Sequence, residues 1–160
     1  MKLLVVEDNP GDEVLLRRRL ATLSAEIEAV ATLRAARSAL EHGRFDAVIF
    51  DLHLPDASPR GLSPLLQGYA EKLPVIVWTG VQDTEIALAL TRAGVTDVID
   101  KACEPPAEVA MRVLLAIERF ERFAGLRRII DAQTTLGRLV ADQAEQTACA
   151  LRLVAAAGVR

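Results

Sequence analysis

Residues 47–51 have the sequence Ala-Val-Ile-Phe-Asp, in which four apolar residues are followed directly by an acid. A short apolar run rich in β-branched residues is typical of a strand that is buried on both faces of a parallel sheet. Four further runs flank this one, the last of them weaker: residues 3–6, 27–31, 75–78 and 98–99. The segments between the runs have helical periodicity, with apolar residues that step by four and then three. The pattern predicts an α/β fold of five strand–helix units around one parallel sheet.

Helix-capping residues agree with this prediction. Asn9 can cap the first helix, and Pro10 would occupy its first turn, where a missing N–H costs little. Gly94 indicates the end of the fourth helix. Pro59 and Pro64 punctuate the segment before residue 71, so we expect a third helix that starts late or is irregular.

The chain has no proline after Pro106, which predicts one or two long helices up to residue 160. The first, over about 107–123, should complete a sheet domain of residues 1–123, followed by a helical extension over 124–160. One heptad frame of the extension places these residues at positions a and d: apolar Leu126, Ile129, Leu136, Val140, Val154 and Ala157, with Gln133, Gln143, Thr147 and Ala150 between them. Such a helix can pack on the sheet domain, pair with a second copy, or lead to a further domain. We favour a homodimer formed through helical elements.

The length and composition are those of one globular domain of roughly 120 residues, followed by about forty further residues. The chain has 160 residues, 51% of them hydrophobic and 26% charged, with a formal net charge of -3. This mildly acidic balance does not favour binding to nucleic acid or to an anionic membrane. The N-terminal apolar run is too short for a signal peptide, and no stretch approaches the roughly 20 apolar residues of a membrane helix. We therefore expect a cytoplasmic protein.

Chemically active side chains follow four of the five predicted strands. Glu7 and Asp8 follow the first, Asp51 the third, Thr79 the fourth and Lys101 the fifth. In open parallel sheets functional groups gather at the carboxyl ends of the strands, near the point where the strand order reverses. We expect three carboxylates, one hydroxyl and one ammonium to converge at this edge.

These residue types together indicate phosphoryl chemistry. Carboxylates that are packed together repel one another, and a hard cation with oxygen ligands offsets that cost, Mg²⁺ being the obvious candidate. Mg²⁺ recruits phosphate oxygens, so a lysine beside the acids indicates a place where a phosphoryl group arrives. Asp51 follows the central strand and is best placed to attack phosphorus. Thr79 and Lys101 would then hold the phosphoryl oxygens by hydrogen bond and charge.

From residue 1 to about 123 the chain resembles the receiver domain of two-component response regulators. Four stretches carry the resemblance: residues 5–10 (VVEDNP), 45–55 (FDAVIFDLHLP), 75–80 (VIVWTG) and 93–101 (AGVTDVIDK). The resemblance implies a flavodoxin-like, doubly wound five-stranded sheet. It also implies that Asp51 accepts phosphate from a sensor histidine kinase or a histidine phosphotransfer protein, and that the acyl phosphate hydrolyses slowly. Mg²⁺ would bind to Glu7, Asp8, Asp51 and the backbone carbonyl of His53.

The chain departs from that family pattern at three places. Val98 occupies the position of an aromatic switch residue, Ala102 replaces the proline that ordinarily follows the lysine, and the loop around residues 56–60 looks about two residues longer. Two other functions share part of this pattern. An aspartate-nucleophile phosphatase of the haloacid-dehalogenase type needs a second aspartate two residues after the nucleophile, where this chain has His53. An inactive interaction module would not need the full set of five groups.

Two interpretations of the whole chain remain open. It can be the N-terminal receiver segment of a longer protein with a sensor, kinase or cyclase output. Alternatively, residues 7–12 resemble single-domain regulators that partner phytochrome-type kinases.

Overall fold

The computed structural model describes residues 1–80, 84–102 and 105–157, with the side chains of all of these except 59, 60, 63, 84, 106 and 146–157. The chain divides into two compact units, residues 1–120 and 121–160.

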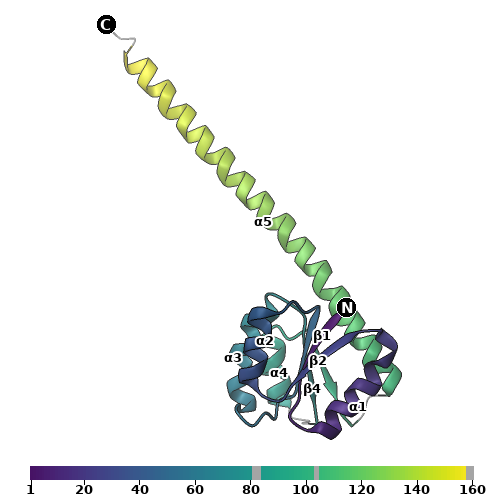
Figure 1. Cartoon of the computed structure of the whole chain (residues 1–160). Helices are drawn as coiled ribbons and strands as arrows, with labels where there is room; N and C mark the ends of the chain where they lie inside the picture. Colours follow the sequence, from purple (N-terminus) through teal and green to yellow (C-terminus); the bar gives the residue numbers. More distant parts are fainter. Residues whose placement is uncertain (81–83, 103–104, 158–160) are drawn as a thin grey trace. The chain divides into compact units, whose positions relative to one another are not determined.

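Five parallel strands form one sheet in the first unit (Figure 1). Their bounds are β1 Lys2–Val6, β2 Glu26–Val30, β3 Ala47–Phe50, β4 Val75–Thr79 and β5 Asp97–Asp100. The order across the sheet is β2-β1-β3-β4-β5, so the order reverses between β1 and β3. The predicted flavodoxin-like α/β fold is confirmed, because the three central strands are apolar runs buried on both faces.

Helices cover both faces of the sheet. The elements are α1 Pro10–Leu20, the 3₁₀ turn η1 Ala21–Leu23, α2 Leu33–His42, α3 Pro59–Ala70, α4 Thr84–Arg92 and α5 Pro106–Ala157. Leu16 and Leu20 of α1 and Val113 of α5 join the core on one face. Leu62 of α3 and Leu90 of α4 join the core on the other face. The sheet is thereby enclosed between α1 and the start of α5 on one side and α2, α3 and α4 on the other (Figure 1).

The helix starts follow from capping residues. The Asn9 side chain accepts a hydrogen bond from the Gly11 N–H at 2.8 Å, which confirms the predicted cap of α1. The expected late start of α3 is wrong, since the helix begins at Pro59 with Ser58 as its cap. A proline suits the first helical position because that N–H would have no intrahelical partner. Pro64 lies inside α3, where it removes one backbone donor.

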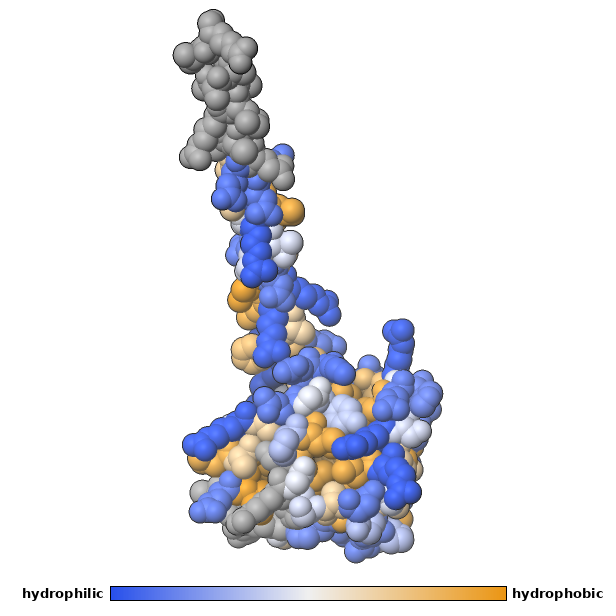
Figure 2. Space-filling model, turned by 90° about the vertical axis from the view of Figure 1, so that its left-hand side faces the viewer, coloured by the Kyte–Doolittle hydropathy of each residue, from blue (hydrophilic) through white to orange (hydrophobic). Residues whose placement is uncertain are grey.

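The second unit belongs to one continuous helix, because α5 runs from Pro106 to Ala157. The single long helix is therefore the correct one of the two expected arrangements. The large apolar side chains described in this unit are 55–65% exposed: Phe123, Leu126, Ile129, Ile130, Leu136, Leu139 and Val140. Figure 2 shows such side chains between charged ones along the unit. Within the described residues no helix is long and apolar enough to cross a membrane.

Candidate functional site

Two neighbouring strands bring the acids together. β1 and β3 pair in a register that sets Val6 beside Phe50, and the Asp51 N–H donates to the Val6 carbonyl at 2.9 Å. The next residues along the two strands are therefore Glu7 and Asp51, at the point where the strand order reverses. Ligand sites of open α/β sheets form at this point because adjacent connections leave on opposite faces. The predicted meeting of the acids at the carboxyl edge is what the structure has.

Lys101, which lies 94 residues after Glu7 in the chain, is in contact with this group of acids. The Lys101 Nζ donates to Glu7 Oε2 at 2.6 Å, to Asp12 Oδ2 at 2.8 Å and to Asp51 Oδ2 at 3.0 Å. The side chains of Glu7, Asp51 and Lys101 are only 1%, 6% and 14% exposed. We call these four residues the acid–lysine cluster. Charged groups this deep are stable only when they are paired, so the ammonium stabilises the buried carboxylates of Glu7 and Asp51.

Burial and charge shift two pKa values in the cluster. Burial raises the pKa of Glu7 above its usual range, and the nearby Asp51 adds to this, although the Lys101 hydrogen bond opposes it. Burial alone would lower the pKa of Lys101. Its hydrogen bonds to Asp12, Glu7 and Asp51 outweigh burial and raise that pKa above the ordinary value. Lys101 is therefore cationic throughout the physiological range.

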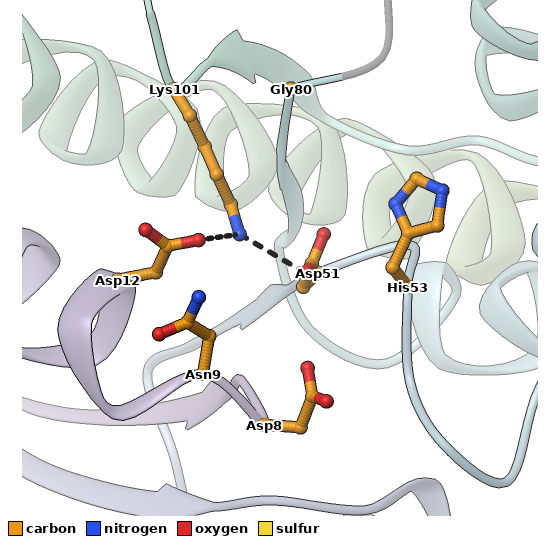
Figure 3. A pocket seen from close by; sticks show the side chains of 7 residues that line it. All are labelled: Asp8, Asn9, Asp12, Asp51, His53, Gly80 and Lys101. Carbon is orange, nitrogen blue, oxygen red and sulfur yellow. Dashed lines mark hydrogen bonds and ion pairs between the residues drawn. The ribbon is translucent and has the colours of Figure 1, made fainter.

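The cluster opens into a cavity of about 420 Å³ (Figure 3). Its lining is polar and comes from the residues that follow β1, β3, β4 and β5 and from the first turn of α1: Asp8, Asn9, Asp12, Asp51, His53, Gly80 and Lys101. Asp8 lies on the side of Asp51 away from Lys101 (Figure 3). The wall of the cavity therefore combines three carboxylates with one ammonium.

The acids are arranged as oxygen ligands for a cation. One carboxylate oxygen from each of Glu7, Asp8 and Asp51 lies within 4.8 Å of the other two. Asp51 Oδ1 is buried and, among the described residues, has no hydrogen-bond partner. A buried carboxylate oxygen without a donor is costly unless a cation completes it. Hard oxygen donors of this kind fit Mg²⁺, and Lys101 occupies only the other oxygen of Asp51.

The remaining predicted site residues are Thr79, which is buried behind the cavity lining, and His53, which lines the cavity. Thr79 ends β4 and is 3% exposed, and its carbonyl accepts the Lys101 N–H at 2.9 Å. Among the described residues, the cavity lining includes its neighbour Gly80 but not Thr79. His53 is exposed and lines the cavity. The peptide bond between Lys101 and Ala102 is trans, since the described residues contain no cis bond.

Two residues of the site were missed by the sequence interpretation. Asp12 pairs with Lys101, and Asn9 lines the cavity in addition to capping α1. A signal for Asp12 existed, because it stands four residues after Asp8 and the first turn of a helix that starts at Pro10 returns it to the same edge. The sequence interpretation did not specify which face of α1 points toward the site.

The loop after β3 forms one side of the rim. The Asp56 carboxylate accepts the N–H groups of Leu33 and Arg34 at 2.8 and 3.0 Å, so this loop caps the start of α2. These two hydrogen bonds lower the pKa of Asp56 below its usual range. Leu54 is buried and pairs with Ala57 in an isolated bridge. The residues of this loop thus connect the strand that carries Asp51 to the neighbouring helix.

Comparison with known proteins gives a consistent result. The family model described as the response regulator receiver domain matches residues 3–112. The response regulator protein PilR of Pseudomonas aeruginosa is 28% identical over 62% of this chain, and the regulatory protein LuxO of Vibrio vulnificus is 30% identical over the same share. The chain spans 22% of the length of each of these relatives.

Solved structures agree on the fold. The signal receiver domain of a LuxO repressor protein from Vibrio parahaemolyticus aligns with a TM-score of 0.68 at 22% identity, covering 78% of this chain and 95% of that one. A CheY-like receiver domain protein from Methanospirillum hungatei aligns with a TM-score of 0.65 at 22% identity, covering 76% of this chain and 96% of that one.

Proposed function

Because the chain belongs to the response regulator receiver domain family, we propose that Asp51 accepts a phosphoryl group from a sensor histidine kinase or a histidine phosphotransfer protein. The observation that carries this proposal is the state of the Asp51 carboxylate. One oxygen is held by the Lys101 ammonium at 3.0 Å, while the other is buried and, among the described residues, unpartnered beside two further acids. A carboxylate held in this way is oriented for attack and needs no proton removed.

The chemistry of the transfer balances on the residues present. An Asp51 oxygen forms a bond to phosphorus, the bond between phosphorus and the donor's histidine nitrogen breaks, and its electron pair returns to the imidazole. The charge on the three equatorial oxygens must be neutralised as they pass through the transition state. Lys101 supplies one positive charge at this point. We propose that the Thr79 hydroxyl donates to a phosphoryl oxygen once the group is attached.

Mg²⁺ supplies the second positive charge in this proposal. Glu7, Asp8 and Asp51 would hold it, together with the backbone carbonyl of His53. When bound, the ion offsets repulsion among the acids and neutralises the oxygens of the incoming group. Asp8 is exposed, so it can exchange water for the ion without reorganising the core.

We propose that phosphorylation changes the conformation of the protein, because it removes the Asp51 carboxylate as a charge partner of Lys101. Attachment of the phosphoryl group turns Asp51 into an acyl phosphate, and the negative charge moves outward to the new oxygens. Lys101 then interacts better with the phosphoryl group than with Asp12 and Glu7, which favours a different arrangement of the β5 end. We propose that slow hydrolysis of the acyl phosphate restores the resting state, so the protein acts as a timed signal and not as an enzyme in the ordinary sense.

The test is phosphorylation by a small phosphodonor such as acetyl phosphate, with and without Mg²⁺. Wild-type protein should acquire one base-labile phosphate in Mg²⁺ and almost none in EDTA. Asp51→Asn should acquire none while its circular dichroism is unchanged. Asp46→Asn is the matched control, because Asp46 is an exposed acid at the start of the same strand. Phosphate retained by Asp51→Asn would contradict the assignment.

We propose that the second unit pairs with a second copy of the chain. Leu126, Ile129, Leu136 and Val140 fall on the a and d positions of one heptad frame, and all four are more than half exposed. A heptad stripe is self-complementary, because the same side chains supply both the knobs and the holes. Phe123, Ile130 and Leu139 widen the stripe. We name these seven residues the heptad stripe.

The size of the stripe favours a partner. Covering seven such side chains removes roughly 400–800 Å² of apolar surface from water per copy. A standard stable interface buries about 800 Å² per partner. Between residues 123 and 145 the charged residues, which include Arg127, Asp131 and Arg138, occupy frame positions b, c and f, away from the stripe. Val154 and Ala157 lie outside the part of the chain whose side chains the structure describes.

The proposed partners also favour a cytoplasmic location for the protein. A sensor histidine kinase draws its phosphate from cytoplasmic ATP, so the receiver that takes it would work in the cytoplasm. The proposed function does not require binding to nucleic acid or to a membrane.

A further inference from the structure

An arginine outside the cavity contacts the backbone of Lys101, a member of the acid–lysine cluster, and the ring of Trp78, which directly precedes Thr79. Arg19 lies in the last turn of α1, and its guanidinium carbon is 5.0 Å from the centroid of the Trp78 ring. Its Nη2 donates to the backbone carbonyl of Lys101 at 3.2 Å. Trp78 is 1% exposed and directly precedes Thr79. One guanidinium thus joins the end of β4 to the backbone of the residue that carries the site's ammonium.

This geometry is not needed to stabilise the end of α1. Three arginines occupy the last turn, and any of them complements the negative end of the helix from solvent. Arg17 bonds to Glu13 and to the Ile27 carbonyl, and Arg18 is exposed. Arg19 is half-buried with its Nε away from solvent. Arg19 thus differs from the other two arginines in contacting the Trp78 ring and the Lys101 backbone.

We propose that Arg19 is a positioning residue, which holds the Lys101 backbone against Trp78 and thereby sets the reach of the Lys101 ammonium toward a phosphoryl group on Asp51. The proposal rests on the function proposed above. Lysine has a flexible four-carbon stem, so the place of its ammonium depends on how firmly its backbone is held. The backbone N–H of Lys101 donates to the Thr79 carbonyl, and the backbone carbonyl of Lys101 accepts a hydrogen bond from Arg19. Both backbone groups of Lys101 are therefore held.

The expected effect is specific to the phosphoryl-bound state. In the free protein Lys101 has three carboxylates to bind, so a loosened backbone still leaves its ammonium partnered. A phosphoryl group requires the ammonium at one place, and the loss of Arg19 then adds an ordering cost. Mg²⁺ binding should not change, because none of the proposed metal ligands contacts Arg19 in the described part of the chain.

The test compares Arg19→Met with Arg18→Met, which removes the same charge from the same helical turn. Binding of beryllium fluoride, a phosphoryl mimic, is measured by ¹⁹F NMR at saturating Mg²⁺. We expect Arg19→Met to bind it at least tenfold more weakly than wild type, with Mg²⁺ affinity within twofold. Arg18→Met should match wild type. Arg19→Lys, which keeps a donor but not the planar group, should recover part of the affinity. Equal affinities for Arg19→Met and Arg18→Met would overturn the proposal.

A second measurement needs no phosphoryl chemistry. In EDTA, hydrogen exchange at the Lys101 N–H should be at least tenfold faster in Arg19→Met than in wild type and unchanged in Arg18→Met. Unchanged exchange in Arg19→Met would show that Arg19 does not position this backbone. If the wild type failed to bind beryllium fluoride, the proposed function would be wrong, and the exchange rates would still decide the role of Arg19. The emission of Trp78, the single tryptophan of the chain, should also change only in the Arg19 variants.

Discussion

The acid–lysine cluster and the heptad stripe differ in opposite ways from an ordinary protein interior and surface, because the cluster buries charged side chains and the stripe exposes apolar ones. In the cluster, the carboxylates of Glu7 and Asp51 are buried, and these two and Asp12 bond to the Lys101 ammonium at 2.6–3.0 Å. In the stripe, apolar side chains are 55–65% exposed. Within the described residues the cluster is complete except for one Asp51 oxygen that has no hydrogen-bond partner, whereas the stripe exposes apolar side chains that a partner can cover. The cluster thus carries the proposed chemistry, and the stripe the proposed assembly.

The largest effect should come from removing the cation of the cluster. Lys101→Met leaves Glu7 and Asp51 buried without their partner, so the free energy of unfolding in EDTA should fall by about 3 kcal/mol. Mg²⁺ should restore part of the loss, because it takes oxygens of the same acids. Urea unfolding measures both quantities. Lys72→Met, at an exposed lysine, is the control. A Lys101 variant as stable as this control would mean that the pairing does not stabilise the fold.

The stripe is tested by placing a charge within it. Leu136→Lys should weaken self-association by roughly thirtyfold, because each of two copies loses about 1 kcal/mol of apolar burial. Thr135→Lys adds the same charge one residue away, outside the stripe, and should have little effect. Sedimentation equilibrium over a dilution series gives the association constants. If both variants associate equally, the stripe is not the interface.

A smaller effect is expected at the exposed acid of the site. Asp8→Asn should weaken Mg²⁺ binding by roughly tenfold or more, since it removes one of three carboxylate ligands. Unfolding in EDTA should be unchanged, in contrast to Lys101→Met, because Asp8 is exposed. Calorimetric titration with Mg²⁺ gives the affinity, and Asp142→Asn in the second unit is the control. An unaltered affinity would remove Asp8 from the ligand set.

The smallest effect concerns the loop that carries Asp56. The N–H groups of Arg34 and Leu33 hold the folded pKa of Asp56 below its ordinary value of 3.8. A lowered folded pKa gives stability that is present above the unfolded pKa and is lost as pH falls through the folded value. Asp56→Asn should therefore lower Tm by a few degrees at pH 7, and the difference from wild type should shrink below about pH 4. A difference that is constant with pH would exclude the charge as its cause.

Most of the fold could be predicted from the sequence because its strands are short, apolar and buried. Each observed strand lies within one residue of its predicted run. The start of α3 was missed because Pro59 and Pro64 were interpreted as helix breakers, although a proline at the first helical position costs no hydrogen bond. The continuity of α5 could not be decided, since Gly125 and Gly137 weaken a helix without ending it.

The candidate site could be predicted where residues follow strands and not where they lie on helices. Glu7, Asp8 and Asp51 were placed correctly, because the carboxyl ends of parallel strands share one edge. Asp12 and Arg19 contact Lys101 only through the rotation of α1 and the reach of long side chains. The spacing from Asp8 was a signal for Asp12, but no sequence period encodes the contact of Arg19. The capping of α2 by Asp56 was missed for the same reason.

One feature of the cluster bears on how the protein is made. The Lys101 ammonium bonds to a carboxylate that lies 94 residues earlier in the chain. During synthesis the first acids leave the ribosome long before the last strand can join the sheet, and such distant contacts form late in folding. Until then, the acids have no lysine and no organised cavity. If Asp51 is the phosphoacceptor as proposed, a nascent or truncated chain would not accept the phosphoryl group, and only molecules that have finished folding would do so.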